Sequence, residues 1–110
     1  MAAKFEIDKS KNDKFYFRLK AGNGEPILGS EIYESKASAK GGIDSVKKNA
    51  PDDARYQKKT ASSGEHYFVL TATNGEPIGK SEMYSSASSR DGGIESVKRN
   101  APSADVVDLT

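Results

Sequence analysis

The sequence predicts an α+β fold made of two copies of one β-β-β-α unit, each followed by an extended segment. Residues 23–27 (Asn-Gly-Glu-Pro-Ile) return unchanged at 74–78, and residues 41–51 return at 92–102 with only conservative changes. Both pairs lie 51 residues apart, and the alignment begins at residues 4 and 55 without a gap. A duplication of this kind indicates one supersecondary unit per copy.

The length of 110 residues suits a single domain, 1–110, with a first repeat at 4–53 and a second at 54–110. A repeat of this size buries too little surface to be stable alone, so we expect the two to share one core. The net charge of +1 gives no support to nucleic-acid binding through bulk charge. The absence of cysteine excludes disulfides, thiolate catalysis and Cys-ligated metals.

The chain start, residues 1–4, leads directly into a strand pattern without the apolar stretch of a signal peptide. No run approaches the roughly 18 apolar residues of a membrane helix. We therefore expect a cytoplasmic protein that makes no membrane contact and carries neither a metal nor a cofactor.

Each repeat begins with strands of alternating polarity. Phe5 and Ile7 alternate with charged residues, which is typical of a half-buried strand. The next strand, residues 14–21, places one set inward: Phe15, Phe17, Leu19 and Ala21. Its outward set is Tyr16, Arg18 and Lys20. The matching strand has His66, Phe68, Leu70 and Ala72 inward, with Tyr67, Val69 and Thr71 outward.

The dipeptides Asn23-Gly24 and Asn74-Gly75 predict a hairpin after the second strand of each repeat. We expect type I′ turns, which need a positive φ at both central residues. Pro26 and Pro77 then begin the third strands, where a missing N–H is tolerated at a first position or an edge.

A helix follows the third strand in each repeat. Ser35 and Ser86 are expected N-caps. One helical face is formed by residues spaced 4, 3 and 4 apart: Ala39, Ile43, Val46 and Ala50. The second copy has Arg90 in place of Ala39, so its first turn should be more exposed. Pro51 ends the first helix, because proline cannot continue one.

Two adjacent glycines in the middle of each helix need an explanation, since each costs about 1 kcal/mol against alanine. They are Gly41-Gly42 and Gly92-Gly93. We expect a close approach between helix and sheet, where a Cβ would clash. An anion site is the alternative if the helix begins at the glycines, but the Ser35 cap argues against it.

The extended segments are residues 54–60 and 105–110. Tyr56 and Lys58 stand where the first repeat has Phe5 and Ile7, so we expect residues 54–60 to be less symmetric and to bridge the repeats. The last segment carries Val106, Val107 and Leu109 and predicts a final strand.

Three motifs occur in the same order in both repeats: Asn-Gly-Glu-Pro-Ile, Ser-Glu-x-Tyr-x-Ser and Gly-Ile-x-Ser-Val-Lys-x-Asn-Ala. In this series the chain resembles the YegP-like family of small bacterial proteins. The resemblance implies an internal pseudo-dimer: one continuous, mostly antiparallel sheet, two helices on one face, and C-terminal strands exchanged between repeats. It implies no established activity and no catalytic or ligand residues. Lys58 and His66 depart from the residues of the first repeat.

Candidate catalytic groups are few. His66 is the only histidine and replaces Phe15, so it is interpreted as filling a half-buried position. The carboxylates that recur in both repeats are Glu25, Glu76, Glu31 and Glu82. A solvated position in a turn explains the first pair, and a favourable charge near a helix N-terminus explains the second, better than a role in acid–base catalysis does. The sequence has no phosphate-binding glycine loop, zinc spacing or calcium loop. We therefore expect no enzyme.

Candidate binding residues lie in two places. Tyr16, Arg18, Lys20 and Tyr67 are predicted on the sheet face without helices, where aromatic and cationic side chains can stack single-stranded nucleic acid. An ordinary solvated sheet face, where tyrosine suits strand propensity, is the favoured interpretation of these residues. The second set lies at the helix C-termini: Lys47, Lys48, Lys98 and Arg99. The usual role of such cations is a favourable interaction with the helix dipole. If both pairs lie on one edge of the molecule, they could instead contact phosphate.

The sheet edges offer a third class of function, strand addition by a protein partner. Lys58-Lys59 and the prolines of the third strands are interpreted as protection of these edges. We expect the strand at 105–110 to dock within the chain, with a swap between chains as the alternative. We conclude that the function is unknown and that a small non-enzymatic binding or protein-interaction module, monomeric as an internal pseudo-dimer, is favoured. The alternative is nucleic-acid binding through the face bearing Tyr16 and Tyr67.

Overall fold

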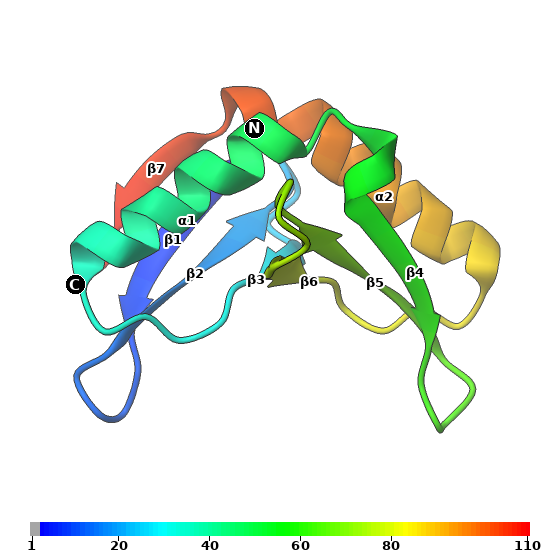
Figure 1. Cartoon of the computed structure of the whole chain (residues 1–110), viewed down its shortest axis with the longest axis horizontal. Helices are drawn as coiled ribbons and strands as arrows, with labels where there is room; N and C mark the ends of the chain where they lie inside the picture. Colours follow the sequence, from blue (N-terminus) through cyan, green and yellow to red (C-terminus); the bar gives the residue numbers. More distant parts are fainter. Residues whose placement is uncertain (1–2) are drawn as a thin grey trace.

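The computed structural model describes residues 3–110, so residues 1 and 2 of the expected 1–110 domain lie outside the described residues. The first repeat contains β1 (Lys4–Lys9), β2 (Phe15–Lys20), β3 (Pro26–Gly29) and α1 (Lys36–Asn49). The second contains β4 (Tyr56–Thr60), β5 (His66–Thr71), β6 (Pro77–Lys80), α2 (Ala87–Asn100) and β7 (Asp105–Asp108). Short 3-10 turns, Asp53–Arg55 and Ala101–Ser103, follow the two helices. The predicted β-β-β-α order of each repeat is confirmed (Figure 1).

One seven-stranded sheet runs through both repeats in the order β4-β5-β6-β3-β2-β1-β7. The pairings are antiparallel except that between β1 and β7, so the predicted mostly antiparallel α+β sheet is confirmed. The repeats meet where β3 lies beside β6, through the pair Gly29 and Lys80. Because β3 and β6 are central, the interpretation of Pro26 and Pro77 as edge protection is wrong. Each proline opens its strand, where no ladder N–H is needed.

The expected exchange of C-terminal strands is also confirmed. Strand β7 follows α2 of the second repeat yet pairs in parallel with β1 of the first, with Phe5 opposite Val106. The segment after α1 crosses in the other direction and becomes β4, which pairs with β5. Strand β7 thus leaves its own repeat for the other one, whereas β4 takes the place in the second repeat that β1 holds in the first.

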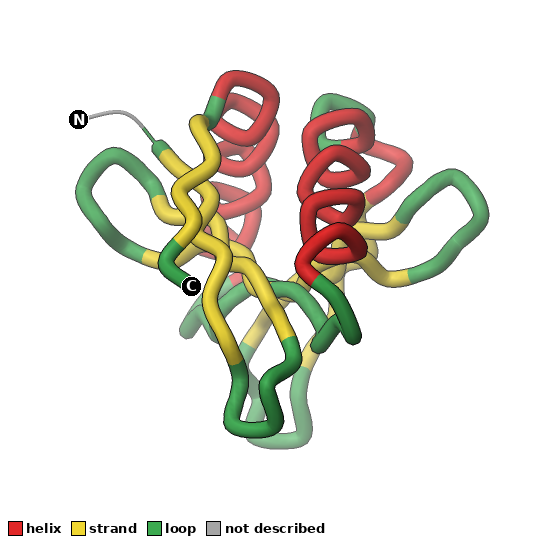
Figure 2. The backbone as a smooth tube through the Cα atoms, turned by 90° about the vertical axis from the view of Figure 1, so that its left-hand side faces the viewer, coloured by secondary structure: helices red, strands yellow, loops and turns green. Residues whose placement is uncertain are grey.

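Both helices cover the same face of the sheet (Figures 1 and 2). Helix α1 packs on β1 and β2 and also on β6 of the other repeat, whereas α2 packs on β5 and reaches β3. The two repeats therefore share one core, whose fully buried side chains include Phe5, Ile7, Phe17, Leu19, Ile43, Val46, Phe68, Leu70 and Val97.

The helix starts follow the sequence prediction. The Ser35 and Ser86 hydroxyl oxygens accept hydrogen bonds from the N–H groups of Ser38 and Ser89, both at 3.1 Å. Helix α1 begins at Lys36, five residues before its first glycine, which removes the alternative of an anion site at a helix start.

The close approach predicted at the paired glycines applies to one glycine in each pair. A Cβ on Gly42 would lie 2.8 Å from Tyr33 Cζ and 2.9 Å from Phe17 Cε2, and closer still to the Tyr33 hydroxyl. A Cβ on Gly93 would lie 2.8 Å from Tyr84 Cζ. The neighbours of these two, Gly41 and Gly92, face open space. The helix is therefore held against a tyrosine ring as well as against the sheet.

The hairpins form where Asn-Gly predicted them, but the type I′ turn is wrong. Among residues 3–110, Asp13 is the only non-glycine residue with a positive φ, whereas Gly24 has φ +85°. The Gly24 N–H donates to the Ala21 carbonyl at 2.9 Å, as in a type I turn followed by a left-handed glycine. Asn23 Oδ1 accepts from the Glu25 N–H at 3.0 Å, which favours this loop over a tighter turn.

Candidate functional site

The helix-free face of the first repeat is organised around a buried carboxylate. Glu6 is only 5% exposed and accepts from Arg18 Nε at 2.8 Å, from Lys20 Nζ at 3.2 Å and from Lys4 Nζ at 3.4 Å. Burial raises the pKa of Glu6, but hydrogen bonds from Lys20, Arg18 and Lys4 outweigh it and hold the pKa below its usual 4.5. Glu6 is therefore a charged hub for this face.

Tyr16, Arg18 and Lys20 lie together on β2, but both cations form ion pairs with Glu6. Arg18 also pairs with Asp8 at 3.3 Å and donates to Tyr16 Oη at 3.2 Å. Burial lowers the pKa of Arg18, and its acceptors more than offset that effect. Sequence reasoning missed the role of Glu6, although its position on the outward side of β1, opposite Arg18, is the signal that could have shown it.

The helix-free face of the second repeat lacks this charge cluster. Gln57, Val69 and Thr71 occupy the positions of Glu6, Arg18 and Lys20. Thr71, expected on the outward face, is buried, and its hydroxyl donates to the Arg55 carbonyl at 2.9 Å. Lys80 Nζ lies 5.0 Å from the ring centre of Tyr67. A cavity of about 320 Å³ lies on this side, lined by Gly29, Ser30, Glu31, Gln57, Lys59, Val69, Pro77, Gly79 and Lys80.

The four cations at the helix C-termini are not all available for binding, because two of them already contact other side chains. Lys47 Nζ lies 5.9 Å from the Phe5 ring centre, and Lys98 pairs with Asp53 and Glu95. The hydrogen bond to Asp53 raises the pKa of Lys98 above its usual value. Lys48 and Arg99 are exposed in the last turns of their helices, where the helix dipole favours them.

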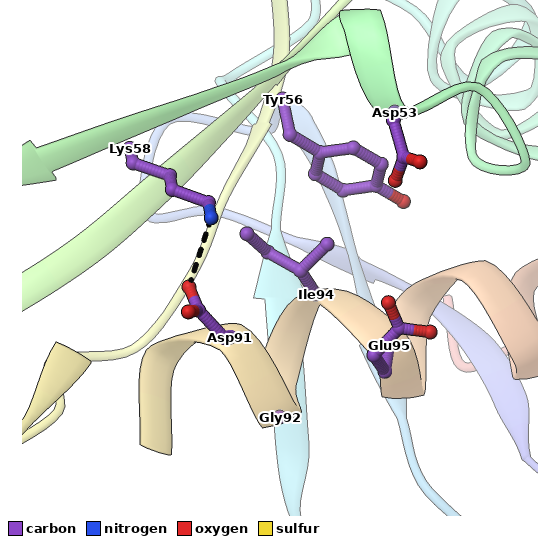
Figure 3. A pocket seen from close by; sticks show the side chains of 7 residues that line it. All are labelled: Asp53, Tyr56, Lys58, Asp91, Gly92, Ile94 and Glu95. Atoms are coloured by element: carbon purple, nitrogen blue, oxygen red, sulfur yellow. Dashed lines mark ion pairs between the residues drawn. The ribbon is translucent and has the colours of Figure 1, made fainter. Parts of the chain in front are cut away.

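A larger cavity, of about 550 Å³, was not anticipated from the sequence. It lies between β4 and α2 and is lined by Asp53, Tyr56, Lys58, Asp91, Gly92, Ile94 and Glu95. Figure 3 shows Tyr56 and Lys58 directed from β4 toward α2, with Ile94 extending from α2 toward Tyr56. Lys58 Nζ pairs with Asp91 at 3.2 Å, and this hydrogen bond lowers the pKa of Asp91.

Tyr56 forms the wall of this cavity next to the core. Its hydroxyl donates to the Ala50 carbonyl at 2.7 Å, and its ring packs edge-on against Phe68. Burial raises the pKa of Tyr56 well above its usual value, and the carboxylates of Asp53 and Glu95 raise it further. The Tyr56 hydroxyl is therefore a fixed neutral donor.

The cavity exists because β4 is an edge strand whose counterpart is covered. Strands β1 and β4 pair with β2 and β5 in the same register, Phe5 opposite Leu19 and Tyr56 opposite Leu70. Strand β7 covers β1, but nothing in residues 3–110 covers β4. The extension of the first repeat is itself β4, so one strand of a fully symmetric sheet is missing. The sequence held a signal for the missing strand, because the repeats follow each other at a gap-free spacing of 51 residues and leave no separate stretch for it.

The structure does not gather the candidate catalytic groups of the sequence. His66 is half-buried and its backbone pairs with Tyr84. Glu25 and Glu76 lie on exposed turns. No group of three or more His, Asp or Glu side chains in residues 3–110 is arranged to hold a metal ion. Within the same residues, no helix is long and apolar enough to cross a membrane.

These features define a tandem-repeat α+β protein, an internal pseudo-dimer in which β7 lies beside β1 while β4 has no corresponding neighbour. The chain belongs to the family described as Domain of unknown function (DUF1508), whose model matches residues 10–57 and again residues 61–108.

Similar proteins cover nearly the whole chain. UPF0339 protein YegP of Escherichia coli (strain K12) is 56% identical over 110 residues, covering 100% of both chains. A UPF0339 protein of Bordetella pertussis (strain Tohama I) is 60% identical over 102 residues, 93% of this chain and 92% of that one.

Two solution NMR structures have the same fold. Protein of unknown function yegP from E. coli matches with a TM-score of 0.94 at 55% identity, covering 100% of this chain and 95% of that one. UPF0339 protein SO3888 from Shewanella oneidensis matches with a TM-score of 0.93 at 50% identity, covering 100% and 93%. No activity is assigned in the names of these relatives, and the function of the family is unknown.

Proposed function

We propose that this protein is a small non-enzymatic interaction module that binds an extended polypeptide segment along the free edge of β4. The observation that carries the proposal is the contrast between the two repeats: β7 lies beside β1, whereas the same edge of β4 is open and borders a cavity of about 550 Å³. Strand addition at such an edge gains affinity from main-chain hydrogen bonds and selectivity from alternate side chains.

The main-chain groups needed for strand addition can be placed from the first repeat. The Leu109 N–H donates to the Ile7 carbonyl at 2.9 Å, so the main chain of Ile7 faces β7. Lys58 occupies the position in β4 that Ile7 holds in β1, so the N–H and carbonyl of Lys58 point toward the free edge. These groups are available to a docked strand without disturbing the pairing of β4 with β5.

Charge on β4 limits which segments dock there. Lys58 and Lys59 are exposed, and lysines on an edge strand prevent indiscriminate pairing between copies. We therefore expect a monomer in solution that accepts only a complementary strand.

A polypeptide fits the molecule better than a nucleic acid does. A single strand stacked on Tyr16 would need phosphate contacts from Arg18 and Lys20, and both cations are already paired with Glu6. Releasing them would leave the buried Glu6 carboxylate with Lys4 as its one remaining cation, which is unfavourable. An enzyme would need a convergent set of reactive groups, and neither cavity collects one.

The test is a titration of isotope-labelled protein, followed by backbone amide shifts, with two eight-residue peptides. One has the sequence of residues 103–110, the segment that docks on β1, and the other is the same peptide with Val106→Lys. We expect at least one of them to shift amides of β4 and of α2 around Ile94. Lys58→Pro should abolish these shifts by removing an outward N–H, whereas Lys58→Ala should retain them. The proposal is overturned if neither peptide shifts β4, or if the shifts survive Lys58→Pro.

A further inference from the structure

We propose that the segment bound at β4 runs parallel to it and carries a lysine or arginine at the position that Val106 holds beside β1. This inference rests on the proposed function and adds the direction and the chemistry of the partner segment. Its basis is the docked strand within the same molecule, which shows where each side chain of such a segment lies.

The first repeat supplies the frame. Strand β7 is parallel to β1, with Val106 beside Phe5 and Asp108 beside Ile7. Val106 and Asp108 face α1, where they line a cavity of about 370 Å³ with Lys40, Ile43 and Asp44. Asp108 pairs with Lys36 at 2.9 Å, and hydrogen bonds from Thr110 and then Lys36 lower its pKa. An acidic strand thus docks against a basic helix face.

The corresponding face of α2 has the opposite charge. Ala87 and Asp91 stand at the positions of Lys36 and Lys40, while Glu95 keeps the acidic character of Asp44. Two cations of the first repeat are therefore replaced by one neutral and one acidic residue. The acidic segment that fits α1 does not fit α2 equally well, because the cations that receive it are missing.

The cavity beside β4 has an apolar floor and an acidic rim (Figure 3). Tyr56 and Ile94 form the floor. On the rim, the side chains of Asp53 and Glu95 are 82% and 64% exposed, whereas their partner Lys98 is only 21% exposed. The carboxylates therefore face solvent, with the paired cation set more deeply.

A basic side chain at the Val106 position satisfies both parts of this cavity. A parallel strand in the register of β7 places that position beside Tyr56 and over Ile94. The aliphatic stem of a lysine would cover the apolar floor while its ammonium group reaches the carboxylates of Glu95 and Asp53. Valine would cover the floor but leave the rim unused.

The next position on the same face does not call for a cation. On the docked segment, the position equivalent to Asp108 lies beside the positively charged Lys58. Lys58 pairs with Asp91 on α2, and Asp91 also pairs with Arg90. An acidic or neutral residue there avoids repulsion with Lys58. The expected pattern is therefore a basic residue followed two positions later by an acidic or neutral one. The segment 103–110 acquires this pattern through Val106→Lys alone.

The test compares the affinities of the two peptides for the β4 edge of the full chain. We expect the Val106→Lys peptide to bind about 10-fold more tightly than the unmodified one at low salt, with the advantage shrinking as salt rises. Glu95→Gln together with Asp53→Asn in the protein should reduce the advantage to less than about 3-fold. Asp44→Asn, the matched change on α1, should leave it intact.

The outcomes separate this inference from the proposed function. Equal binding of the two peptides at β4 would overturn the requirement for a basic residue while leaving strand docking in place. Shifts confined to β1 and α1 would mean that the peptide displaces β7, and would overturn the assignment to β4. Failure of both peptides to shift either edge would overturn the docking proposal itself, and this inference with it.

Discussion

The two adjacent glycines of α1 should respond to alanine in opposite directions. Gly41 faces open space, so Gly41→Ala gains the helix preference of alanine at no steric cost. Gly42→Ala would place a Cβ against the Tyr33 hydroxyl, 2.8 Å from Tyr33 Cζ and 2.9 Å from Phe17 Cε2. Tyr33 stacks on the buried ring of Phe17 and its backbone pairs with Phe15, so the tyrosine has little room to withdraw.

The magnitudes follow from these contacts. Gly41→Ala should raise the free energy of unfolding by about 0.5–1 kcal/mol. Gly42→Ala gains the same preference but forces the two rings apart, and overpacking of this kind costs about 1–3 kcal/mol. We expect a net loss of about 1–2 kcal/mol, or a fall in Tm of roughly 4 °C per kcal/mol for a chain of this size.

Urea unfolding followed by circular dichroism, with thermal melts beside it, measures both variants. The second repeat provides an internal replicate, because Gly92 is open and Gly93 meets Tyr84. Adding Tyr33→Phe to Gly42→Ala removes the contact with the hydroxyl and should recover part of the loss. Equal stabilisation by Gly41→Ala and Gly42→Ala would refute the reasoning, since it would mean that the tyrosine does not hold the helix in place.

Three further outcomes are expected. Glu6→Gln should cost about 1–3 kcal/mol in urea unfolding at pH 7, because the acceptor shared by Arg18 and Lys20 loses its negative charge. Gln57→Ala, at the matching position, should be nearly neutral. Since folding lowers the pKa of Glu6, the stability that Glu6 contributes is present above about pH 4.5 and is lost as pH falls through the folded pKa. Glu6→Gln should therefore reduce the loss of stability in acid. An acid profile that the substitution leaves unchanged would exclude Glu6 as a source of that loss. Deleting residues 105–110 should uncover β1 and lower the free energy of unfolding by about 2–4 kcal/mol. It should also promote self-association, which light scattering would detect. A truncated chain that stays monomeric and fully stable would show that β7 does not protect β1.

The local elements were predictable because their signals are local. Alternation along Phe15 to Lys20 specified a strand and its buried side, and Ser35 with the spacing of Ile43 and Val46 specified the start and inner face of a helix. The turn type at Asn23-Gly24 was missed because a hydrogen bond from Asn23 and a left-handed Gly24 favour a longer loop than a type I′ turn. The exchange of strands came only from resemblance, since the alternation of β7 does not show which strand it pairs with.

The candidate sites were less predictable, because they depend on which strands become neighbours. Arg18 and Lys20 are basic residues on an outward face in the sequence, but the pairing of β1 with β2 places Glu6 among them and neutralises the face. The cavity at β4 arises from an absent neighbour, which no residue of β4 encodes by itself.

The sequence by itself determined the duplication, the identity of each strand and helix and the need for a shared core, because hydrophobic period, caps and turns act over a few residues. Only the tertiary structure decided that β7 covers β1 while β4 stays open, and that Asp91 and Glu95 face the open edge. The physical reason is that the single stretch after α1 serves both as the extension of one repeat and as the first strand of the next. It cannot lie in two places, so β4 is left without the neighbour that β7 provides for β1.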